Sequence, residues 1–327
     1  MLSQVILLIV GLVALFYGGN WLVRGASNLA LSLGVSVLII ALTFVALGTS
    51  MPELLVSLQA AFSGKSDLAI GNVIGSNIAN IGLILGFTGL ITPLSVKAIL
   101  LRREIPIMIL VSVFTYALTL DGQIGRADGL MLLIAFLGFN AIFYVLAKRE
   151  SDTRERLLSD LDDAPEAGLA RGREVAYLIA GIIALLLGSR LMVESAVLLA
   201  RAVGISELII AITLVAFGTS LPELAASISA AWHKETDLAI GNVVGSNIAN
   251  LLLILGATAF LRPIPVARAD VQFEFIVMIA FAALLIPFMR KQRLGRKPSA
   301  LFLLAYCAFI AYSILGDSPS PVADLLQ

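Results

Sequence analysis

Residues 45–86 read VALGTSMPELLVSLQAAFSGKSDLAIGNVIGSNIANIGLILG, and residues 215–256 read VAFGTSLPELAASISAAWHKETDLAIGNVVGSNIANLLLILG. The two stretches align without a gap at an offset of 170 residues, and about two-thirds of their positions are identical. Each copy places one glutamate, Glu53 or Glu223, inside a long apolar run, where an ionised carboxylate is costly. Two such residues at matched positions predict one site that is built from two halves.

The composition predicts a protein that crosses a membrane many times. Of the 327 residues, 59% are hydrophobic and 13% are charged, and the mean hydropathy is +1.00. A soluble domain needs more polar surface than this, and apolar runs of membrane-spanning length recur along the chain. We interpret the first run, from Leu2, as a retained span, because no small-residue cleavage site and soluble domain follow it. The single cysteine, Cys307, excludes an internal disulfide.

The fold predicted is an all-α membrane protein with ten transmembrane helices. The second span begins near Val35 and is interrupted at residues 48–53, and the seventh has the same interruption at residues 218–223. The ten predicted spans cover 2–30, 35 onward through the interruption, 68–91, 104–120, 127–146, 175–202, 206–231, 238–261, 271–289 and 299–315.

The repeat extends beyond the central motif and divides the chain into two units. Gly11 and Gly18 recur as Gly181 and Gly188 at the same offset, and Glu104 recurs as Glu274. The units are residues 1–147 and 175–327, joined by a charged segment over residues 148–174. Five spans per unit force the second copy to enter the membrane from the opposite side. This predicts two inverted-topology five-helix repeats with a site near the bilayer midplane.

The distribution of Lys and Arg predicts the orientation in the cytoplasmic (inner) membrane. The loops on the same side as residues 148–174 hold 15 of these residues, and the remaining loops together with one span end hold 5. Because basic residues are retained in the cytoplasm, the charged segment is predicted to be cytoplasmic and both termini are predicted to be extracytoplasmic.

The repeated Gly-Thr-Ser-X-Pro-Glu motif predicts a broken helix with oxygen ligands. Proline lacks an amide hydrogen and disrupts a helix, and carbonyls freed inside a membrane must find another partner. A bound cation is such a partner, and we expect the freed carbonyls to be those of Ala46 and Ala216. The side chains predicted at the same level are Thr49, Ser50, Glu53, Thr219, Ser220 and Glu223.

The following span of each copy adds hydroxyl and amide groups on one helix face. Ser76 and Asn80 are separated by four residues, as are Ser246 and Asn250. The combined set contains carboxylate, hydroxyl, amide and carbonyl oxygens, which suit hard cations such as Ca²⁺ or Na⁺. Two carboxylates balance one Ca²⁺, and competition between ions for one set of ligands is a simple basis for exchange. Either copy alone is also compatible with a kinked, tightly packed helix, but two copies favour an ion site.

The two blocks resemble the paired alpha repeats of the calcium/cation antiporter superfamily, specifically its prokaryotic sodium/calcium exchanger branch, over essentially the whole chain. The resemblance implies a ten-helix antiporter that works by alternating access, in which the long first and sixth helices slide against a core that holds a cluster of cations. It implies as ion ligands Ala46, Thr49, Ser50, Glu53, Ser76, Asn80, Ala216, Thr219, Ser220, Glu223, Ser246 and Asn250.

Both Asn80 and Asn250 are asparagine, whereas relatives often carry an aspartate at one of these positions. The site then has two carboxylates, which argues against K⁺ co-transport and is compatible with exchange of one Ca²⁺ for several Na⁺. Exchange of H⁺ for Ca²⁺ through Glu53 and Glu223 stays open, and a cation channel is a further alternative. An enzyme is disfavoured, because the sequence lacks a His/Glu zinc-binding motif and the two aspartates of an aspartyl site, and its one histidine lies in a loop. We expect no cofactor and no nucleic-acid partner, and the oligomeric state is not predicted.

Overall fold

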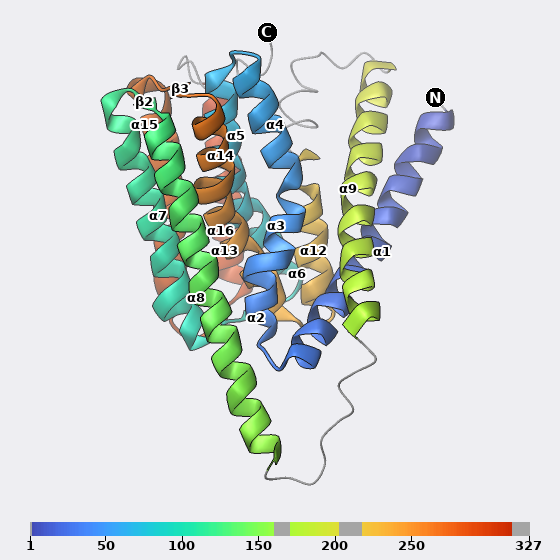
Figure 1. The fold of residues 1–327 in the computed structure, drawn as a ribbon. Helices are drawn as coiled ribbons and strands as arrows, with labels where there is room; N and C mark the ends of the chain where they lie inside the picture. Colours follow the sequence, from blue (N-terminus) through green and yellow to red (C-terminus); the bar gives the residue numbers. More distant parts are fainter. Residues whose placement is uncertain (1, 160–170, 203–217, 316–327) are drawn as a thin grey trace.

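Helices make up nearly all of the computed structural model, which describes residues 2–159, 171–202 and 218–315 (Figure 1). The first half contains α1 (Leu2–Leu33), α2 (Val37–Ile40), α3 (Ala46–Thr49), α4 (Met51–Phe62), α5 (Ser66–Ala79), α6 (Gly86–Ile91), α7 (Ile105–Leu118) and α8 (Arg126–Ser159). The second half contains α9 (Arg171–Ala202), α12 (Leu221–Trp232), α13 (Thr236–Ala249), α14 (Leu255–Leu261), α15 (Arg268–Met289) and α16 (Arg296–Leu315).

Short irregular turns connect several of these helices into longer ones. Four are π-helical, namely η1 (Ala41–Val45), η2 (Asn80–Leu85), η3 (Leu100–Glu104) and η6 (Asn250–Ile254), and η4 (Thr119–Asp121) is a 3₁₀ turn. The turns η2 and η6 begin at matched positions, at Asn80 and Asn250. Such π-helical turns inside α-helices are frequent at functional sites.

The helices confirm a multi-pass membrane protein. Within the described residues, seven helices are long and apolar enough to cross a membrane, and the bent pair Val37–Thr49 and Met51–Phe62 raises the number to eight. The other two predicted spans are α16 and the segment that includes α12, whose first part (residues 203–217) lies outside the described residues. The count of ten therefore stays a prediction. Helix α8 continues to Ser159, so it extends into the charged segment that was predicted to begin at residue 148.

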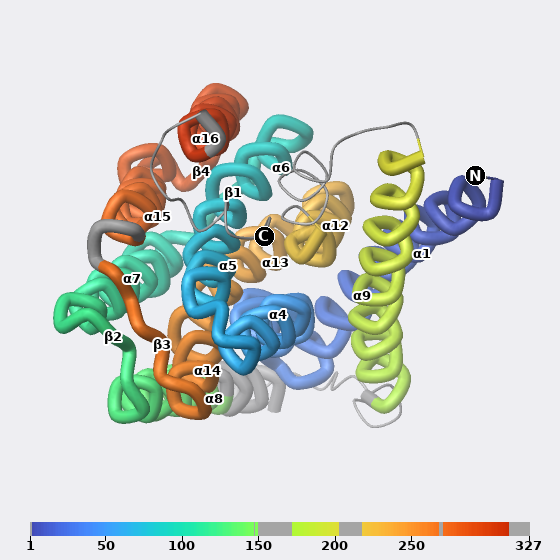
Figure 2. The backbone as a smooth tube through the Cα atoms, turned by 90° about the horizontal axis from the view of Figure 1, so that it is seen from above, coloured from blue at the N-terminus to red at the C-terminus, as the bar shows by residue number. Residues whose placement is uncertain are grey.

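Helices α1 and α9 pack against each other in opposite directions at the edge of the bundle (Figures 1 and 2). Their contact is lined by glycines, because a Cβ at Gly11 would lie 2.8 Å from the carbonyl oxygen of Gly188. At Gly18 a Cβ would lie 3.1 Å from the carbonyl oxygen of Gly181. Only residues without a side chain allow two helix backbones to approach so closely. The four glycines singled out in the sequence thus set the distance between α1 and α9.

Two small strand pairs show that the halves make the same contacts with their roles exchanged. Strand β1 (Leu94–Ser95) pairs antiparallel with β4 (Arg293–Leu294), and β2 (Gln123–Ile124) pairs antiparallel with β3 (Ile264–Pro265). Leu94 lies opposite Leu294, and Ile124 lies opposite Ile264. Residue 94 plus 170 is residue 264, and residue 294 minus 170 is residue 124, so the first pairing becomes the second when the two halves are exchanged. Two halves related by a twofold axis are expected to behave in this way.

The helices that carry the repeated motif lie at the centre of the molecule (Figure 2). In the span Thr236–Leu261, 94% of the most apolar window is buried, and in Ser66–Ile91 the share is 72%. In Leu2–Leu33 it is only 22%. Helices that are apolar on all sides are expected inside a bundle. Polar residues on these two spans are therefore shielded from lipid by the surrounding helices.

We expect Gly129→Ala in α8 to destabilise the protein by about 1–3 kcal/mol, as overpacking does in other proteins. A Cβ at Gly129 would lie 2.4 Å from the backbone nitrogen of Phe260 and 2.7 Å from the carbonyl oxygen of Gly256, and neither backbone atom can move aside alone. Thermal unfolding of the purified protein measures the effect. Gly138→Ala on the same helix is the control, because no described atom outside the adjacent backbone of α8 lies within 4 Å of its Cβ position. Equal unfolding temperatures for the two variants would contradict this packing.

Candidate ion-binding site

The two motif glutamates occupy the first turns of α4 and α12, directly after the helix break in each half. Ser50 and Ser220 precede these helices with nearly the same backbone angles, φ −83° and ψ 11° against φ −87° and ψ 3°. Proline follows in the first turn, where its missing amide hydrogen costs nothing. Negative charge is favoured at a helix N-terminus. Local sequence therefore explains why both glutamates are placed here.

Both carboxylates are buried and contact the opposite half of the chain. Glu53 and Glu223 are each only 1% exposed. The hydroxyl of Ser50 donates to Oε1 of Glu223 at 3.0 Å, and the side chain of Thr219 lies beside the carboxylate of Glu53. The second oxygen, Oε2, has no hydrogen-bond partner in either glutamate among the described residues. Each half thus orients the other half's carboxylate and leaves one oxygen unpartnered.

Four asparagines of α5, α13 and the following π-helical turns form a reciprocal network at the centre. The side-chain nitrogen of Asn77 donates to the carbonyl oxygen of Asn247 at 3.3 Å, and that of Asn247 donates to the carbonyl oxygen of Asn77 at 3.2 Å. The Asn80 amide donates to Oδ1 of Asn247 at 2.9 Å, and the Asn250 amide donates to Oδ1 of Asn77 at 3.0 Å. Every bond has a counterpart at the offset of 170.

This network determines which atom of the Asn80 and Asn250 side-chain amides is left without a hydrogen-bond partner. Asn80 and Asn250 donate through their nitrogens, and their Oδ1 atoms have no partner among the described residues. The Oγ atom of Ser246 is also buried without a partner. Buried polar atoms are almost always satisfied, and leaving one unsatisfied costs about 1–3 kcal/mol. The unpartnered oxygens of the motif are Oε2 of Glu53, Oε2 of Glu223, Oδ1 of Asn80, Oδ1 of Asn250 and Oγ of Ser246.

These five oxygens have the chemistry of a site for a hard cation. Two belong to carboxylates, which have no hydrogen to donate when they are ionised, and two are oxygens of amides whose nitrogens are already hydrogen-bonded. Carboxylate, amide and hydroxyl oxygens are the ligands that Ca²⁺ prefers. They come from both halves of the chain, as the sequence predicts.

The expectation that the proline break frees the carbonyl of Ala46 is wrong. The helix continues through Thr49, and the amide of Ser50 donates to the Ala46 oxygen at 3.1 Å. The proline removes instead the amide that would bond the carbonyl four residues earlier, which is that of Gly48. The hydroxyl of Thr49 also lies 3.4 Å from this oxygen, so the Ala46 carbonyl already has a second donor beside it.

The matched carbonyl in the second half has a side-chain partner. Ser189 of α9, itself 4% exposed, donates its hydroxyl to the carbonyl oxygen of Gly218 at 2.8 Å. Gly218 lies four residues before Pro222, so this bond replaces the amide that the proline lacks. The position that matches Ser189 in the first half is Gly19, which has no hydroxyl. The two halves therefore differ at this contact.

We expect Ser189→Ala to destabilise the protein by about 1–3 kcal/mol, because the buried carbonyl of Gly218 loses its donor. The unfolding temperature of the purified protein measures this loss. Ser63→Ala is the matched control, because Ser63 is exposed beyond the end of α4. A Ser189→Ala protein as stable as the control would show that the carbonyl is satisfied in another way.

The remaining predicted ligands lie around the same centre. Thr49, Ser76 and Ser220 are buried, and the hydroxyl of Thr49 lies 3.2 Å from Oδ1 of Asn242. Thr219 is half-buried beside Glu53. Ala216 lies outside the described residues. All the described members of the predicted set except Ala46 thus present a side-chain oxygen at or beside the motif.

Sequence reasoning missed the residues that orient the ligands. Asn77 and Asn247 hold the amides of Asn80 and Asn250, and Asn72 donates to Oγ of Ser57 at 2.9 Å. The signal was present, because these asparagines recur at the same offset inside apolar spans. A repeated polar residue on a buried helix requires a partner, and the partner of Asn77 is its own counterpart.

Comparison with known proteins identifies the family. The family described as "Sodium/calcium exchanger protein" matches residues 3–145 and 174–315, which correspond to the two halves. The chain is 38% identical to the putative antiporter CaxA of Alkalimonas amylolytica, over 96% of this chain and 99% of that protein. It is 32% identical to the sodium/calcium exchanger MaX1 of Methanosarcina acetivorans, over 93% of this chain and 97% of that protein.

A solved structure has the same fold. The sodium-calcium exchanger NCX_Mj, soaked with zero Na⁺ and Ca²⁺, superposes with a TM-score of 0.81 at 33% identity and covers 94% of this chain and 98% of its own. Exchangers are transporters and not enzymes, and the resemblance seen in the motifs is confirmed at the level of sequence and of fold. The chain is a member of the sodium/calcium exchanger family, a family of cation antiporters.

Proposed function

We propose that the protein exchanges Na⁺ for Ca²⁺ across the cytoplasmic membrane as a secondary antiporter. The observation that carries this proposal is the set of five buried, unpartnered oxygens that both halves contribute. Two carboxylates neutralise one Ca²⁺. Several Na⁺ can occupy overlapping sets of the same oxygens when Ca²⁺ is not bound. The relatives named as sodium/calcium exchangers support Na⁺ as the coupling ion.

The ligand set that we propose is the one predicted from the sequence, with Glu53 and Glu223 as the charged members. Asn77 and Asn247 are added as positioning residues that orient Asn80 and Asn250. The hydroxyls of Ser50 and Thr219 cross between the halves, so a cation bound at the centre would hold both halves together. The ions are substrates, and we propose no resident cofactor.

We also propose ten spans in two inverted-topology repeats, residues 1–147 and 175–327. The antiparallel contact of α1 with α9 supports this arrangement, as do the reciprocal strand pairs. The termini would lie outside the cell and residues 148–174 in the cytoplasm.

Alternating access in this arrangement requires α1 and α9 to move against the core. Helix α9 contacts both helix breaks: a Cβ at Gly48 would lie 2.5 Å from Cδ1 of Ile182, and one at Gly218 would lie 2.6 Å from Cγ2 of Val193. A helix that covers both breaks is well placed to open one side of the site while it closes the other.

Equilibrium binding of radioactive Ca²⁺ to the purified protein tests the proposed site. We expect saturable Ca²⁺ binding that Na⁺ displaces with a Hill coefficient above one, and we expect K⁺ at the same concentration to have no such effect. Displacement by protons with no effect of Na⁺ would assign the protein to H⁺/Ca²⁺ exchange. Absence of Ca²⁺ binding would contradict the assignment of the site.

We expect Asn250→Asp to change ion preference, because it adds a third negative charge beside Glu53 and Glu223. An extra carboxylate strengthens binding of cations and introduces a new titrating group, so the pH dependence of Ca²⁺ binding is expected to shift. Asn80→Asp is the matched variant, and the reciprocal network predicts a similar change. If both variants kept the Ca²⁺ affinity, Na⁺ competition and pH profile of the original protein, these asparagines would not be ligands.

A further inference from the structure

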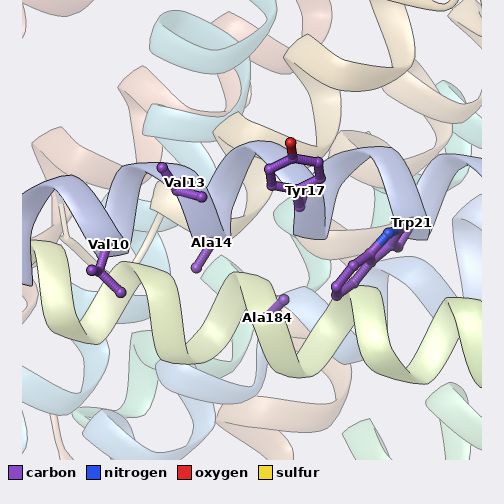
Figure 3. A pocket seen from close by; sticks show the side chains of 6 residues that line it. All are labelled: Val10, Val13, Ala14, Tyr17, Trp21 and Ala184. Carbon is purple, nitrogen blue, oxygen red and sulfur yellow. The ribbon is translucent and has the colours of Figure 1, made fainter.

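An apolar groove runs along the outer side of the contact between α1 and α9 (Figure 3). It is lined by Val10, Val13, Ala14, Tyr17, Trp21 and Ala184 and has a volume of about 380 Å³. Tyr17 and Trp21 are 51% and 40% exposed, and their ring centroids are 6.2 Å apart. The groove therefore opens towards the lipid and has an aromatic wall near one end.

The lining residues of α1 form a stripe that ends at an arginine. Residues at intervals of three and four lie on one face of a helix. Tyr17, Trp21 and Arg24 continue this spacing, so Arg24 lies one turn beyond the aromatic wall. On α9, Tyr177 lies two turns from Ala184 on the same face. The Cζ atom of Arg24 stands 4.5 Å from the ring centroid of Tyr177, so both helices contribute to this end of the groove.

Arg24 differs from three other arginines of the described residues. Arg103, Arg173 and Arg190 each pair with a glutamate next to them or one turn away. Arg24 is exposed, and it forms no ion pair within the part of the chain that the structure describes. A stacked aromatic ring orients a guanidinium but leaves its hydrogen-bond donors available.

The position of Arg24 along α1 places it at a membrane surface. At 1.5 Å per residue it lies about 33 Å from Leu2 and about 14 Å from Leu33. The hydrocarbon layer is about 30 Å thick. With Leu2 at one surface of this layer, the apolar stripe from Val10 to Trp21 would lie within the hydrocarbon and Arg24 would lie at the level of the lipid headgroups on the other side.

We propose that this groove binds one membrane phospholipid with an anionic headgroup. The phosphate is held by the guanidinium of Arg24, which suits a phosphate because it can donate two parallel hydrogen bonds. One acyl chain follows the groove past Trp21 and Tyr17 towards Val10. The bound lipid contacts α1 and α9 together, so it would favour one relative position of these two helices. The inference does not depend on the identity of the transported ions.

Tryptophan fluorescence tests this site, because Trp21 lines the groove and the chain has only one other tryptophan, Trp232. The Trp232→Phe protein is reconstituted into bilayers that contain increasing fractions of phosphatidylglycerol or phosphatidylcholine with brominated chains, which quench nearby tryptophan. We expect half-maximal quenching at a roughly fivefold lower fraction of the brominated phosphatidylglycerol. This factor corresponds to about 1 kcal/mol for one basic residue near the membrane surface.

Two substitutions in the same background separate the headgroup contact from general attraction. We expect Arg24→Gln to abolish the preference for phosphatidylglycerol and Arg24→Lys to retain much of it. Arg102→Gln removes an exposed arginine that is not beside the groove, and we expect it to leave the preference unchanged. Equal quenching by both lipids in the Trp232→Phe protein would overturn the proposal, as would an unchanged preference in Arg24→Gln. Either result would mean that only ordinary boundary lipid covers this face.

A third substitution tests the groove itself without a change in charge. Ala184→Phe places a ring in the groove, and we expect it to reduce quenching by both lipids. Ile183→Phe is the control, because Ile183 is 50% exposed on the same helix and does not line the groove. Equal quenching in these two variants would exclude an acyl chain from the groove, even if Arg24→Gln failed to fold.

Discussion

Replacement of Glu53 or Glu223 with glutamine is expected to lower Ca²⁺ uptake at least 100-fold, to the background of empty vesicles. Each substitution removes one of two charges from the site and replaces an acceptor with an amide that can present hydrogens to the cation. A loss of about 3 kcal/mol in binding, typical for removal of a charged partner at a buried site, corresponds to this factor. The measurement is uptake of radioactive Ca²⁺ into vesicles that contain the purified variant.

The glutamine variants are expected to stay folded, because glutamine has the shape of glutamate and removes a buried charge. Their unfolding temperatures are therefore expected to equal or exceed that of the original protein. Glu235→Gln serves as the control, because Glu235 lies in the loop before α13 and is only half-buried. Near-normal uptake by either variant would remove that glutamate from the site.

Asn247→Ala is expected to weaken Ca²⁺ binding at least tenfold, although Asn247 is not proposed as a ligand. Oδ1 of Asn247 accepts a hydrogen bond from the side-chain nitrogen of Asn80 at 2.9 Å, and this bond fixes which way the Asn80 amide is turned. Without the acceptor, the Asn80 side chain can rotate and present its nitrogen to the cation. The reciprocal bond predicts a similar loss for Asn77→Ala, which releases Asn250.

Ca²⁺ affinity and unfolding temperature must be measured together for these asparagine variants. Loss of buried partners also destabilises the fold, by about 1–3 kcal/mol for each atom left unsatisfied. Asn140→Ala is the matched control, because the Asn140 amide bonds the carbonyl oxygen of Phe136 in its own helix, α8. If Asn247→Ala lowered the unfolding temperature but bound Ca²⁺ as well as the control did, Asn247 would have a structural role only.

The sequence was sufficient to place most of the helices and to single out the two buried glutamates of the proposed site. Hydrophobic runs of spanning length gave most boundaries to within a few residues, because lipid enforces helices wherever a chain crosses it. The repetition at an offset of 170 singled out both glutamates and the pair Asn80 and Asn250. Two glutamates at matched positions inside apolar runs indicate a functional site even when no other sequence is available for comparison.

Properties that depend on contacts between distant helices could not be read from the sequence. The partner of Asn77 is Asn247, 170 residues away, and no local pattern specifies which donor meets which acceptor. The carbonyl of Ala46 keeps its amide partner because the helix breaks at Ser50 and not before it. The hydroxyl of Ser189 reaches Gly218 only because α9 packs across the break. Tertiary packing decided the partners of Asn77 and Gly218, whereas the bond to Ala46 depends on the exact residue at which its helix breaks.

The asymmetry between the halves is informative for the proposed movement. The reciprocal asparagine network treats both halves alike, whereas Ser189 has a hydroxyl and its counterpart Gly19 has none. The asparagines of the central helices thus treat both halves of the proposed ion site alike, whereas α9 contacts the two helix breaks through different side chains. In the proposed alternating access, the same site would face each side of the membrane in turn.

The most direct test of the proposed activity is uptake of radioactive Ca²⁺ into vesicles that contain the purified protein. Three internal conditions are compared: vesicles loaded with Na⁺, vesicles loaded with K⁺, and vesicles with only a pH gradient. Exchange of Na⁺ for Ca²⁺ predicts uptake that requires internal Na⁺ and that collapses when external Na⁺ is added. Uptake driven equally well by the pH gradient in the absence of Na⁺ would contradict Na⁺ coupling and would make Glu53 and Glu223 carriers of protons.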